Sequence, residues 1–404
     1  MCVSAKKHNK NDDKNEESLT FSSVLSSLKK VTLDEITENS KGKGISKSDI
    51  TKEGTPCIRY GELYTYYNEI TEKILSKTQL DKNSLVLSEY GDILIPSSGE
   101  TPEDIATATC VLNENIAIGG DITILKTTEN PIYLSYYINA KTKNIAKYAQ
   151  GVSIVHLYYD DFKNIELFIH SKEEQEKIAN FLSLIDKKIG LLEEKQEVFK
   201  KYKKEILKDT FSKKSNSEKI RISDLGSFSS GYTFKPEYQR CENSEIPFFK
   251  VSDLNLNKKY MKISNNYINK ETCDKLKYKT INKPSIIFAK IGEAIYLERK
   301  RIAYPPFLID NNLLSFQPSP EYSLEFIYYI FQSLNISRYA QKTALPSLPS
   351  KEVGSIECYI PSSKTSQRLI TDFLIDLDKK NSIIEKNIML VKNLKEFLLQ
   401  NLFI

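Results

Sequence analysis

The chain has 404 residues, with 58 Lys+Arg against 53 Asp+Glu and a net charge of +5. This length is too great for one ordinary core and predicts two domains with connectors, while the mild basic excess permits a nucleic-acid partner without demanding one. The six cysteines are scattered without a Cys-x-x-Cys pair, which argues against a disulfide framework and a zinc site and fits a reducing cytoplasm.

Residues 1–30 begin with a charged run and continue polar, without the apolar stretch of a secretory signal. We expect an N-terminal tail that is partly disordered. Nowhere does the sequence approach the run of about 18 apolar residues that a membrane span needs. The expectation is therefore a cytoplasmic protein without a membrane partner.

Residues 31–170 alternate short apolar runs with turn signals, which is typical of a mixed α+β domain. We expect strands at 85–87, 93–95, 122–125 and 165–167 and a helix at 131–137. The loops mix glycine, hydroxyl and basic side chains, which suit DNA phosphates and base edges, although plain surface loops are the alternative for any one residue. The candidate DNA contacts here are Lys41, Lys43, Lys47, Arg59, Tyr60, Thr65, Tyr66, Ser97 and Ser98.

Residues 171–214 are expected to form a long helical spacer, because apolar residues recur every seven positions and proline is absent. The recurring positions are Ile178, Ile185, Leu192, Phe199 and Ile206. Five consecutive heptads indicate a coiled coil, in which Lys203 interrupts the second apolar seam.

Residues 219–362 repeat the α+β pattern, with strands expected at 246–249, 286–288 and 313–316 and a helix at 324–330. The candidate DNA contacts here are Ser230, Tyr232, Thr233, Lys235, Lys250, Lys290, Arg299, Lys300, Arg301 and Ser347. This segment has 20 basic and 14 acidic residues, net +6, whereas 31–170 has 13 and 20, net −7. Bulk charge therefore favours DNA binding by the second segment only.

Residues 363–404 are expected to form a second helical spacer with the same heptad pattern and no proline. Its recurring positions are Ile370, Leu377, Ile384, Val391 and Leu398. Lys395 and Asn381 interrupt its second seam. Two such helices, each about 55 Å long at 1.5 Å per residue, favour an antiparallel coiled coil with an approximate two-fold axis. The alternative is that each helix packs on its own domain.

The chain also repeats itself at an offset of about 190 residues. Residues 175–211 align without gaps on 367–403, and Lys147-Tyr148-Ala149-Gln150 matches Arg338-Tyr339-Ala340-Gln341. Several matches in one order are hard to obtain by chance. A duplicated unit therefore runs from about 31 to 211 and from about 219 to 404.

A duplicated domain followed each time by a helix resembles the specificity subunit of type I restriction–modification systems. The motifs that resemble the family are Gly91-Asp92-Ile93-Leu94-Ile95 with Gly99, 174–179, Ile185-Asp186-Lys187-Lys188-Ile189 and Ala344-Leu345-Pro346-Ser347-Leu348. The resemblance covers nearly the whole chain from about residue 31.

The resemblance implies a non-catalytic subunit whose two target-recognition domains each read one half of a split site in double-stranded DNA. It implies two methyltransferase subunits and restriction/translocase subunits as partners. S-adenosylmethionine, ATP and magnesium would belong to those partners, with no cofactor in this chain. We expect the coiled coil to dock them, with Lys187 and Lys188, or Lys379 and Lys380, facing a partner; a solvated intramolecular face is the alternative.

The residues themselves carry no recognisable catalytic motif. A Gly-rich cofactor loop and a P-loop are missing, and Pro305-Pro306-Phe307 lacks the preceding Asn or Asp of a methyltransferase motif. Glu298-Arg299-Lys300 echoes the Glu-x-Lys of metal nucleases, but a charged surface strand or loop is favoured. No metal site is expected. The alternatives to a DNA reader are a coiled-coil scaffold with two protein-binding domains and a metal-dependent nuclease.

Overall fold

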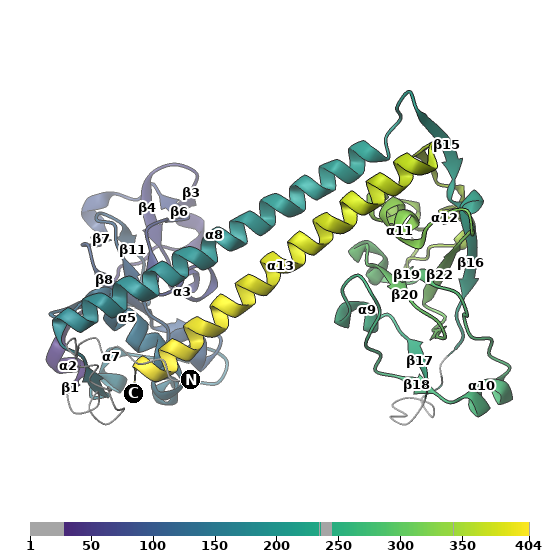
Figure 1. The fold of residues 1–404 in the computed structure, drawn as a ribbon. Coiled ribbons are helices and arrows are strands. Elements are labelled where there is room, and N and C mark those ends of the chain that lie inside the picture. The colour runs from purple at the N-terminus through teal and green to yellow at the C-terminus, as the bar shows by residue number, and fades with distance from the viewer. Residues whose placement is uncertain (1–27, 234, 236–244, 342, 404) are drawn as a thin grey trace, which may run out of the picture. The chain divides into compact units, whose positions relative to one another are not determined.

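The computed structural model describes residues 28–233, 235, 245–341 and 343–403 (Figure 1). The chain divides into two compact units, Met1–Leu191 with Ile388–Ile404, and Leu192–Asn387. We call them unit 1 and unit 2. Each contains one α+β domain and one half of each of two long helices, α8 (Lys172–Thr210) and α13 (Lys364–Leu402). The expected tail falls, apart from residues 28–30, outside the described residues.

The domain of unit 1 is built on two five-stranded sheets. The first has the order β2 (Thr37–Lys41), β12 (Ile122–Thr127), β8 (Asp92–Pro96), β10 (Thr109–Val111) and β5 (Ile70–Thr71). The second has the order β3 (Ile50–Thr51), β6 (Ser76–Thr78), β4 (Thr55–Ile58), β11 (Ala117–Ile118) and β7 (Val86–Leu87). Two short pairs join β1 (Lys29–Thr32) to β14 (Glu166–Ile169) and β13 (Val155–His156) to β9 (Ser98–Gly99).

The domain of unit 2 has a four-stranded sheet, a three-stranded sheet and one strand pair. The first has the order β16 (Gly226–Ser230), β22 (Leu313–Pro318), β19 (Ser285–Ala289) and β20 (Lys300–Ala303). The second has the order β18 (Tyr267–Ile268), β17 (Ile246–Phe249) and β21 (Leu308–Ile309). Strand β15 (Ser217–Arg221) pairs with β23 (Glu357–Pro361).

Short helices complete both domains. Unit 1 contains α2 (Leu33–Ile36), α3 (Tyr60–Thr65), α4 (Pro102–Ile105), α5 (Pro131–Ala140), α6 (Thr142–Ile145) and α7 (Tyr159–Phe162). Unit 2 contains α9 (Asp253–Leu256), α10 (Lys270–Leu276), α11 (Leu324–Ser333) and α12 (Ser350–Ser355). Every strand and helix expected from the sequence falls on an observed element of the same type, and the α+β class is confirmed.

The duplicated helices α5 and α11 form the centre of the two domains. The Asn130 side chain accepts from Tyr133 N at 3.0 Å at the start of α5, and Ser323 caps α11 in the same way at 3.2 Å. The tyrosines of both helices are buried, and so are the phenylalanines of α11. They pack against the sheets on one side and the long helices on the other, within a single apolar cluster in each unit.

The long helices pair with each other in both units (Figure 1). In unit 1 the early residue Asp186 of α8 contacts the late residue Lys395 of α13, and in unit 2 the late residue Lys203 contacts the early residue Asp378. The pairing is therefore antiparallel. All ten recurring heptad residues are buried or half-buried. The alternative of two helices that pack separately on their own domains is wrong.

Candidate nucleic-acid interface

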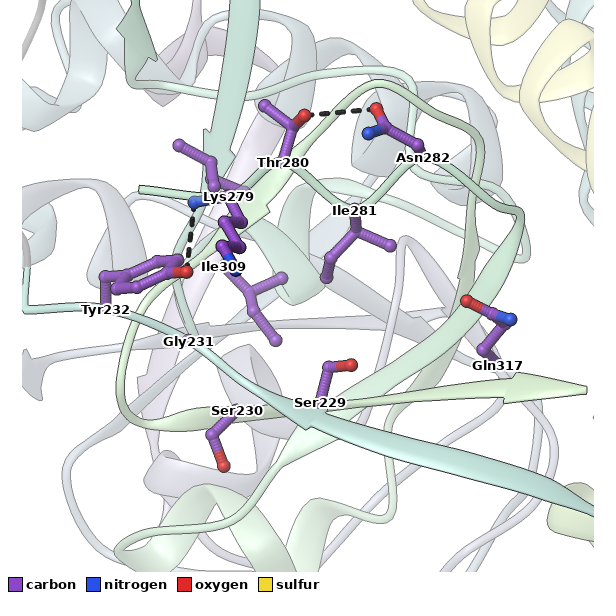
Figure 2. Close-up of a pocket in the computed structure, with 11 residues that line it drawn as sticks. Ser229, Ser230, Gly231, Tyr232, Lys279, Thr280, Ile281, Asn282, Ile309 and Gln317 are labelled. Carbon is purple, nitrogen blue, oxygen red and sulfur yellow. Dashed lines mark hydrogen bonds between the residues drawn. The ribbon is translucent and has the colours of Figure 1, made fainter. Parts of the chain in front are cut away.

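A polar cavity of about 390 Å³ opens in unit 2 beside the end of strand β16 (Figure 2). The end of β16, the start of the following loop, β21 and the loop 279–282 line it. Two of the residues selected from the sequence, Ser230 and Tyr232, belong to this lining. Backbone groups, hydroxyls and the amides of Asn282 and Gln317 supply the donors and acceptors that base edges and phosphates require.

Gly231 allows the loop after β16 to lie against β21. A Cβ at this position would lie 2.1 Å from the carbonyl oxygens of Ile309 and Asp310, so only glycine fits. The close approach lets Tyr232 N donate to Ile309 O at 3.0 Å. The loop that carries the candidate residues is thus fixed to the sheet by its backbone.

The same arrangement occurs in unit 1. A Cβ on Gly42 would lie 2.0 Å from Gly119 O, and Lys43 N donates to Ile118 O at 3.0 Å. Lys43 therefore occupies in unit 1 the position that Tyr232 occupies in unit 2. The duplication that the sequence shows extends to the loops that carry the candidate DNA contacts.

An aromatic pair stands beside the cavity of unit 2. The rings of Tyr232 and Tyr278 stack with centroids 4.2 Å apart and planes 15° apart. Lys279 N donates to the Tyr232 hydroxyl at 3.0 Å, as Figure 2 shows, and the Tyr278 hydroxyl donates to Thr233 O at 2.6 Å. Sequence reasoning missed Tyr278, although it stands between Lys277 and Lys279, a basic and aromatic alternation that suits nucleic acid.

Lys290 and Ser347 lie next to this loop. Lys290 Nζ donates to Ser230 Oγ at 3.3 Å, and its carbonyl accepts from Leu348 N at 2.8 Å. Ile291 forms a β-bridge with Ser347. The structure thus brings together Ser230, Lys290 and Ser347, three candidates that are spread over more than a hundred residues of sequence.

The basic run 299–301 differs from the expectation. Lys300 is 2% exposed, pairs with Glu298 and donates to Leu334 O at 2.8 Å, and burial lowers its pKa. Arg301 donates to the carbonyls of Asn257 and Lys300 at 2.7 and 3.0 Å. Lys300 is therefore withdrawn as a DNA contact, and a charged surface loop does not describe it either.

Two candidates in unit 1 are also withdrawn because they are buried. Ser97 and Ser98 are 4% and 5% exposed. Ser97 Oγ lies 3.0 Å from Thr123 Oγ1, and Ser98 Oγ lies 3.0 Å from His156 Nδ1. Both hydroxyls hold strands together, a role that residue type alone does not reveal.

The remaining candidates of unit 1 fall into three groups. Lys41, Lys43 and Lys47 are exposed and lie near the start of the domain, with Lys41 Nζ 5.3 Å from the centroid of the Tyr158 ring. Tyr66 instead lines a cleft beside α8. Arg59 is tied to Glu62 at 3.0 Å, and Tyr60 and Thr65 are exposed on α3.

A buried polar cluster joins the domain of unit 1 to both long helices. Lys395 Nζ of α13 lies 2.7 Å from Asp186 Oδ1 of α8 and 2.7 Å from a carboxylate oxygen of Glu69 in the domain. The Tyr136 hydroxyl of α5 donates to Asp186 Oδ2 at 2.5 Å. We call these four residues the Asp186 cluster. Lys395, which interrupts the apolar seam in sequence, is here paired with two carboxylates.

Unit 2 contains the equivalent Asp378 cluster. Asp378 of α13 pairs with Lys203 of α8, accepts from the Tyr329 hydroxyl of α11 at 2.7 Å and pairs with Lys259 at 3.1 Å. Lys259 also pairs with Glu325 at 2.6 Å. Burial would raise the pKa of Asp378, but Lys203, Tyr329 and Lys259 outweigh it and hold the pKa below its usual value.

Two clefts of similar size flank the long helices, one in each unit. The cleft of unit 1 has about 780 Å³ and includes Asp186 and Lys187 in its lining; the cleft of unit 2 has about 720 Å³ and includes Asp378 and Lys379. Because 186–187 and 378–379 are equivalent positions, the clefts are equivalent too. Lys187 and Lys379 were selected from the sequence as docking residues, and both are exposed.

An exposed apolar stripe is also present on both helices. Phe181, Leu191, Val198 and Tyr202 of α8 are each exposed, and so are their equivalents Phe373, Ile383, Leu390 and Leu394 of α13. The spacings of four to ten residues place each set on one face of its helix. Apolar faces of this extent on a helix indicate a protein partner.

No helix among the described residues is long and apolar enough to cross a membrane. Within the same residues, no group of three or more His, Cys, Asp and Glu side chains is placed to hold a metal ion.

Comparison with protein families gives one match that spans both units. The model of the type I restriction modification DNA specificity domain matches residues 26–201 and again 214–393. The two matches correspond to the two halves of the duplication.

Individual relatives agree with this match. The chain is 27% identical over 304 residues to the Type I restriction enzyme MjaIX specificity subunit of Methanocaldococcus jannaschii, covering 67% of each chain. It is 24% identical over 237 residues to a putative type I specificity subunit of Mycoplasma genitalium, covering 54% of this chain and 57% of that one.

Two solved structures have the same fold. A crystal structure of a type I restriction–modification system S subunit from M. genitalium is similar with a TM-score of 0.61 at 20% identity, covering 93% of this chain and 96% of that chain. A structure reported for complex assembly and conformational transition of the type I restriction–modification system gives 0.59 at 13% identity, covering 92% and 96%.

Proposed function

The chain belongs to the type I restriction modification DNA specificity family, and from this membership we propose that it reads a split DNA target, one half-site with each of its two domains. The observation that carries the proposal is the duplicated loop, pinned by Gly42 against β11 in unit 1 and by Gly231 against β21 in unit 2. The two loops differ in sequence but are fixed by the same backbone contact. Equivalent positions with different side chains suit two readers of two different half-sites.

The cavity of unit 2 is the proposed reader of one half-site. Lys279 and Lys290 provide cations for phosphates, while Ser230 and Asn282 present donors and acceptors to base edges. Lys41, Lys43 and Lys47 have the corresponding role in unit 1. The domain of unit 1 is net acidic, but neighbouring lysines can still attract phosphates. The field of exposed charges is screened beyond about 8–10 Å, so distant carboxylates do not cancel it.

The chain is proposed to supply recognition and no catalysis. Glu298 is the acid of the nuclease-like motif, and its carboxylate already has partners in the described structure. It pairs with Lys300 and accepts from Ser337 N at 2.7 Å. S-adenosylmethionine, ATP and magnesium would be bound by partner subunits. Since the substrate is the DNA of the cell, we place the protein's action in the cytoplasm.

Two methyltransferase subunits are proposed to dock on the long helices, with restriction/translocase subunits joining that complex. The clefts beside Lys187 and Lys379 and the apolar stripes each occur twice. A surface that is present in two equivalent copies suits two copies of one partner.

Sequencing of adenine methylation in a host that carries the complete system tests the proposal. The expected result is one asymmetric motif of two half-sites separated by a fixed unread gap. Methylation at continuous sites, or none that depends on this chain, contradicts it. DNA affinity that is weak and indifferent to sequence would point to a scaffold with two protein-binding domains instead.

A further inference from the structure

We propose that the Asp186 cluster and the Asp378 cluster fix the register of the helix pair and tie each recognition domain to it, and so set the length of the unread gap. This inference rests on the proposed function.

The order of charges along each helix favours an antiparallel pair. In α8 the aspartate, Asp186, lies in the first half and the lysine, Lys203, in the second; α13 has Asp378 and Lys395 in the same order. An antiparallel pair brings each aspartate to a lysine, as observed. A parallel pair would bring like charges together, so the charges select the orientation.

The same ion pairs also define the register of the two helices. The apolar heptads alone permit a shift of seven residues, because Ile, Leu, Val or Phe stands at the same position of every heptad. Both observed ion pairs fit a single antiparallel register, Asp186 opposite Lys395 and Lys203 opposite Asp378. A shift of seven residues would separate both lysines from their aspartates while leaving the apolar seam intact.

Each cluster also includes groups from a recognition domain. Tyr136 and Tyr329 reach the aspartates from α5 and α11, and Glu69 and Lys259 reach the clusters from loops. The charged side chains of both clusters are only 13–24% exposed, so solvent screens them far less than a surface pair. A helix that slips must therefore break contacts with its domain as well as with its partner.

A phenylalanine after each long helix makes contacts that fit the same register. Phe403, which follows α13, stacks on Tyr137 of α5 with centroids 4.9 Å apart. Its equivalent Phe211, which follows α8, lies 5.9 Å from Phe326 of α11. Each helix thus ends on the domain that the other helix follows.

A shift of the register would change the DNA that the complex accepts. Seven residues correspond to about 10 Å at 1.5 Å per residue, which is about three base pairs at 3.4 Å each. A loosened register should therefore leave both half-sites unchanged and broaden the gap between them.

The test variant is Lys203→Met/Lys395→Met, in the complete complex with its methyltransferase subunits. Methionine keeps most of the length of the lysine side chain and removes the charge. The control is Lys177→Met/Lys208→Met, which removes two lysines of exposed pairs, 70% and 80% exposed, from α8. A second variant, Asp186→Asn/Asp378→Asn, is isosteric and replaces the methionine variant in the same measurement if that variant does not fold.

Methylome sequencing compares methylation of the same half-sites at different gap lengths. We expect the variant's preference for the wild-type gap to fall by about tenfold, and the control to keep it. An unchanged preference, or an equal loss of methylation at every gap, would overturn the inference. If the wild-type complex methylates no split target, the proposed function has failed instead.

Discussion

At the residue scale, side-chain type predicted which residues could contact DNA but not which ones reach the surface. Lys290 and Lys300 look alike in sequence, yet Lys290 joins Ser230 beside a cavity and Lys300 is buried against Glu298. Ser97 was chosen for its hydroxyl, and that hydroxyl bonds across a sheet. Burial depends on strand pairing over distances of tens of residues, which local composition does not encode.

Lys290→Ala should weaken DNA binding by the complex at every target sequence and reduce the slope of log K against log salt by about 0.9, as expected for one lost phosphate contact. Fluorescence anisotropy over a salt series measures both quantities. Lys351→Ala, which removes an exposed lysine of α12, is the matched control. An unchanged slope for Lys290→Ala would exclude the phosphate contact.

Low pH should lower the free energy of unfolding of unit 2, because Asp378 becomes protonated. The pKa of this carboxyl lies below its usual value of 3.8 in the folded chain, so its pairing stabilises the fold fully above that value. The contribution is lost as the pH falls below it and the carboxyl becomes protonated. Asp378→Asn should therefore melt at a lower temperature near neutral pH and show a shallower decline from about pH 5 to about pH 3.

Differential scanning calorimetry at several pH values measures this difference. Asp372→Asn, which changes a 63% exposed carboxylate of the same helix, should keep the wild-type pH dependence. Parallel pH profiles for wild type and Asp378→Asn would show that the Lys203 pair contributes no stability.

At the scale of elements, periodicity was enough to predict both long helices and their antiparallel pairing. Lys203 and Lys395 interrupt the apolar seam, as the sequence indicated, but periodicity did not predict that both pair with carboxylates, one of which, Glu69, lies in a loop remote in sequence. Heptad analysis considers one helix face at a time. It cannot identify a polar group that a third element satisfies.

Insertion of one heptad into each helix, between Lys187 and Tyr202 in α8 and at the equivalent place in α13, should lengthen the unread gap by about three base pairs. Both ion pairs would still form, since both helices grow by the same amount. The half-sites should be unchanged in the methylome. Insertion into α8 alone should instead abolish methylation, because it moves one cluster out of register.

At the scale of the whole molecule, the internal duplication carried most of the correct prediction. It gave two α+β domains, two equivalent helices and the family, and it did so from matches such as Asp186 with Asp378. Charge was less informative: one domain is net acidic and the other net basic, while both are matched by the same family model. Domain limits at 170, 214 and 362 remain predictions.

The proposed docking of methyltransferase subunits belongs to the whole molecule, because the two equivalent clefts lie in different units. Lys187→Glu/Lys379→Glu should reduce recovery of methyltransferase in a pull-down by several-fold, because both residues line equivalent clefts. Lys77→Glu/Lys351→Glu is a control of equal charge change at exposed sites outside these clefts. Equal recovery for both variants would place the docking surface elsewhere, with the apolar stripe as the next region to test.

The order of charge along the helices makes each helix self-complementary. A helix with an acid in its first half and a base in its second is complementary to an inverted copy of itself. A chain of one domain and one helix should therefore pair with a second copy of itself through the same two contacts that join α8 to α13.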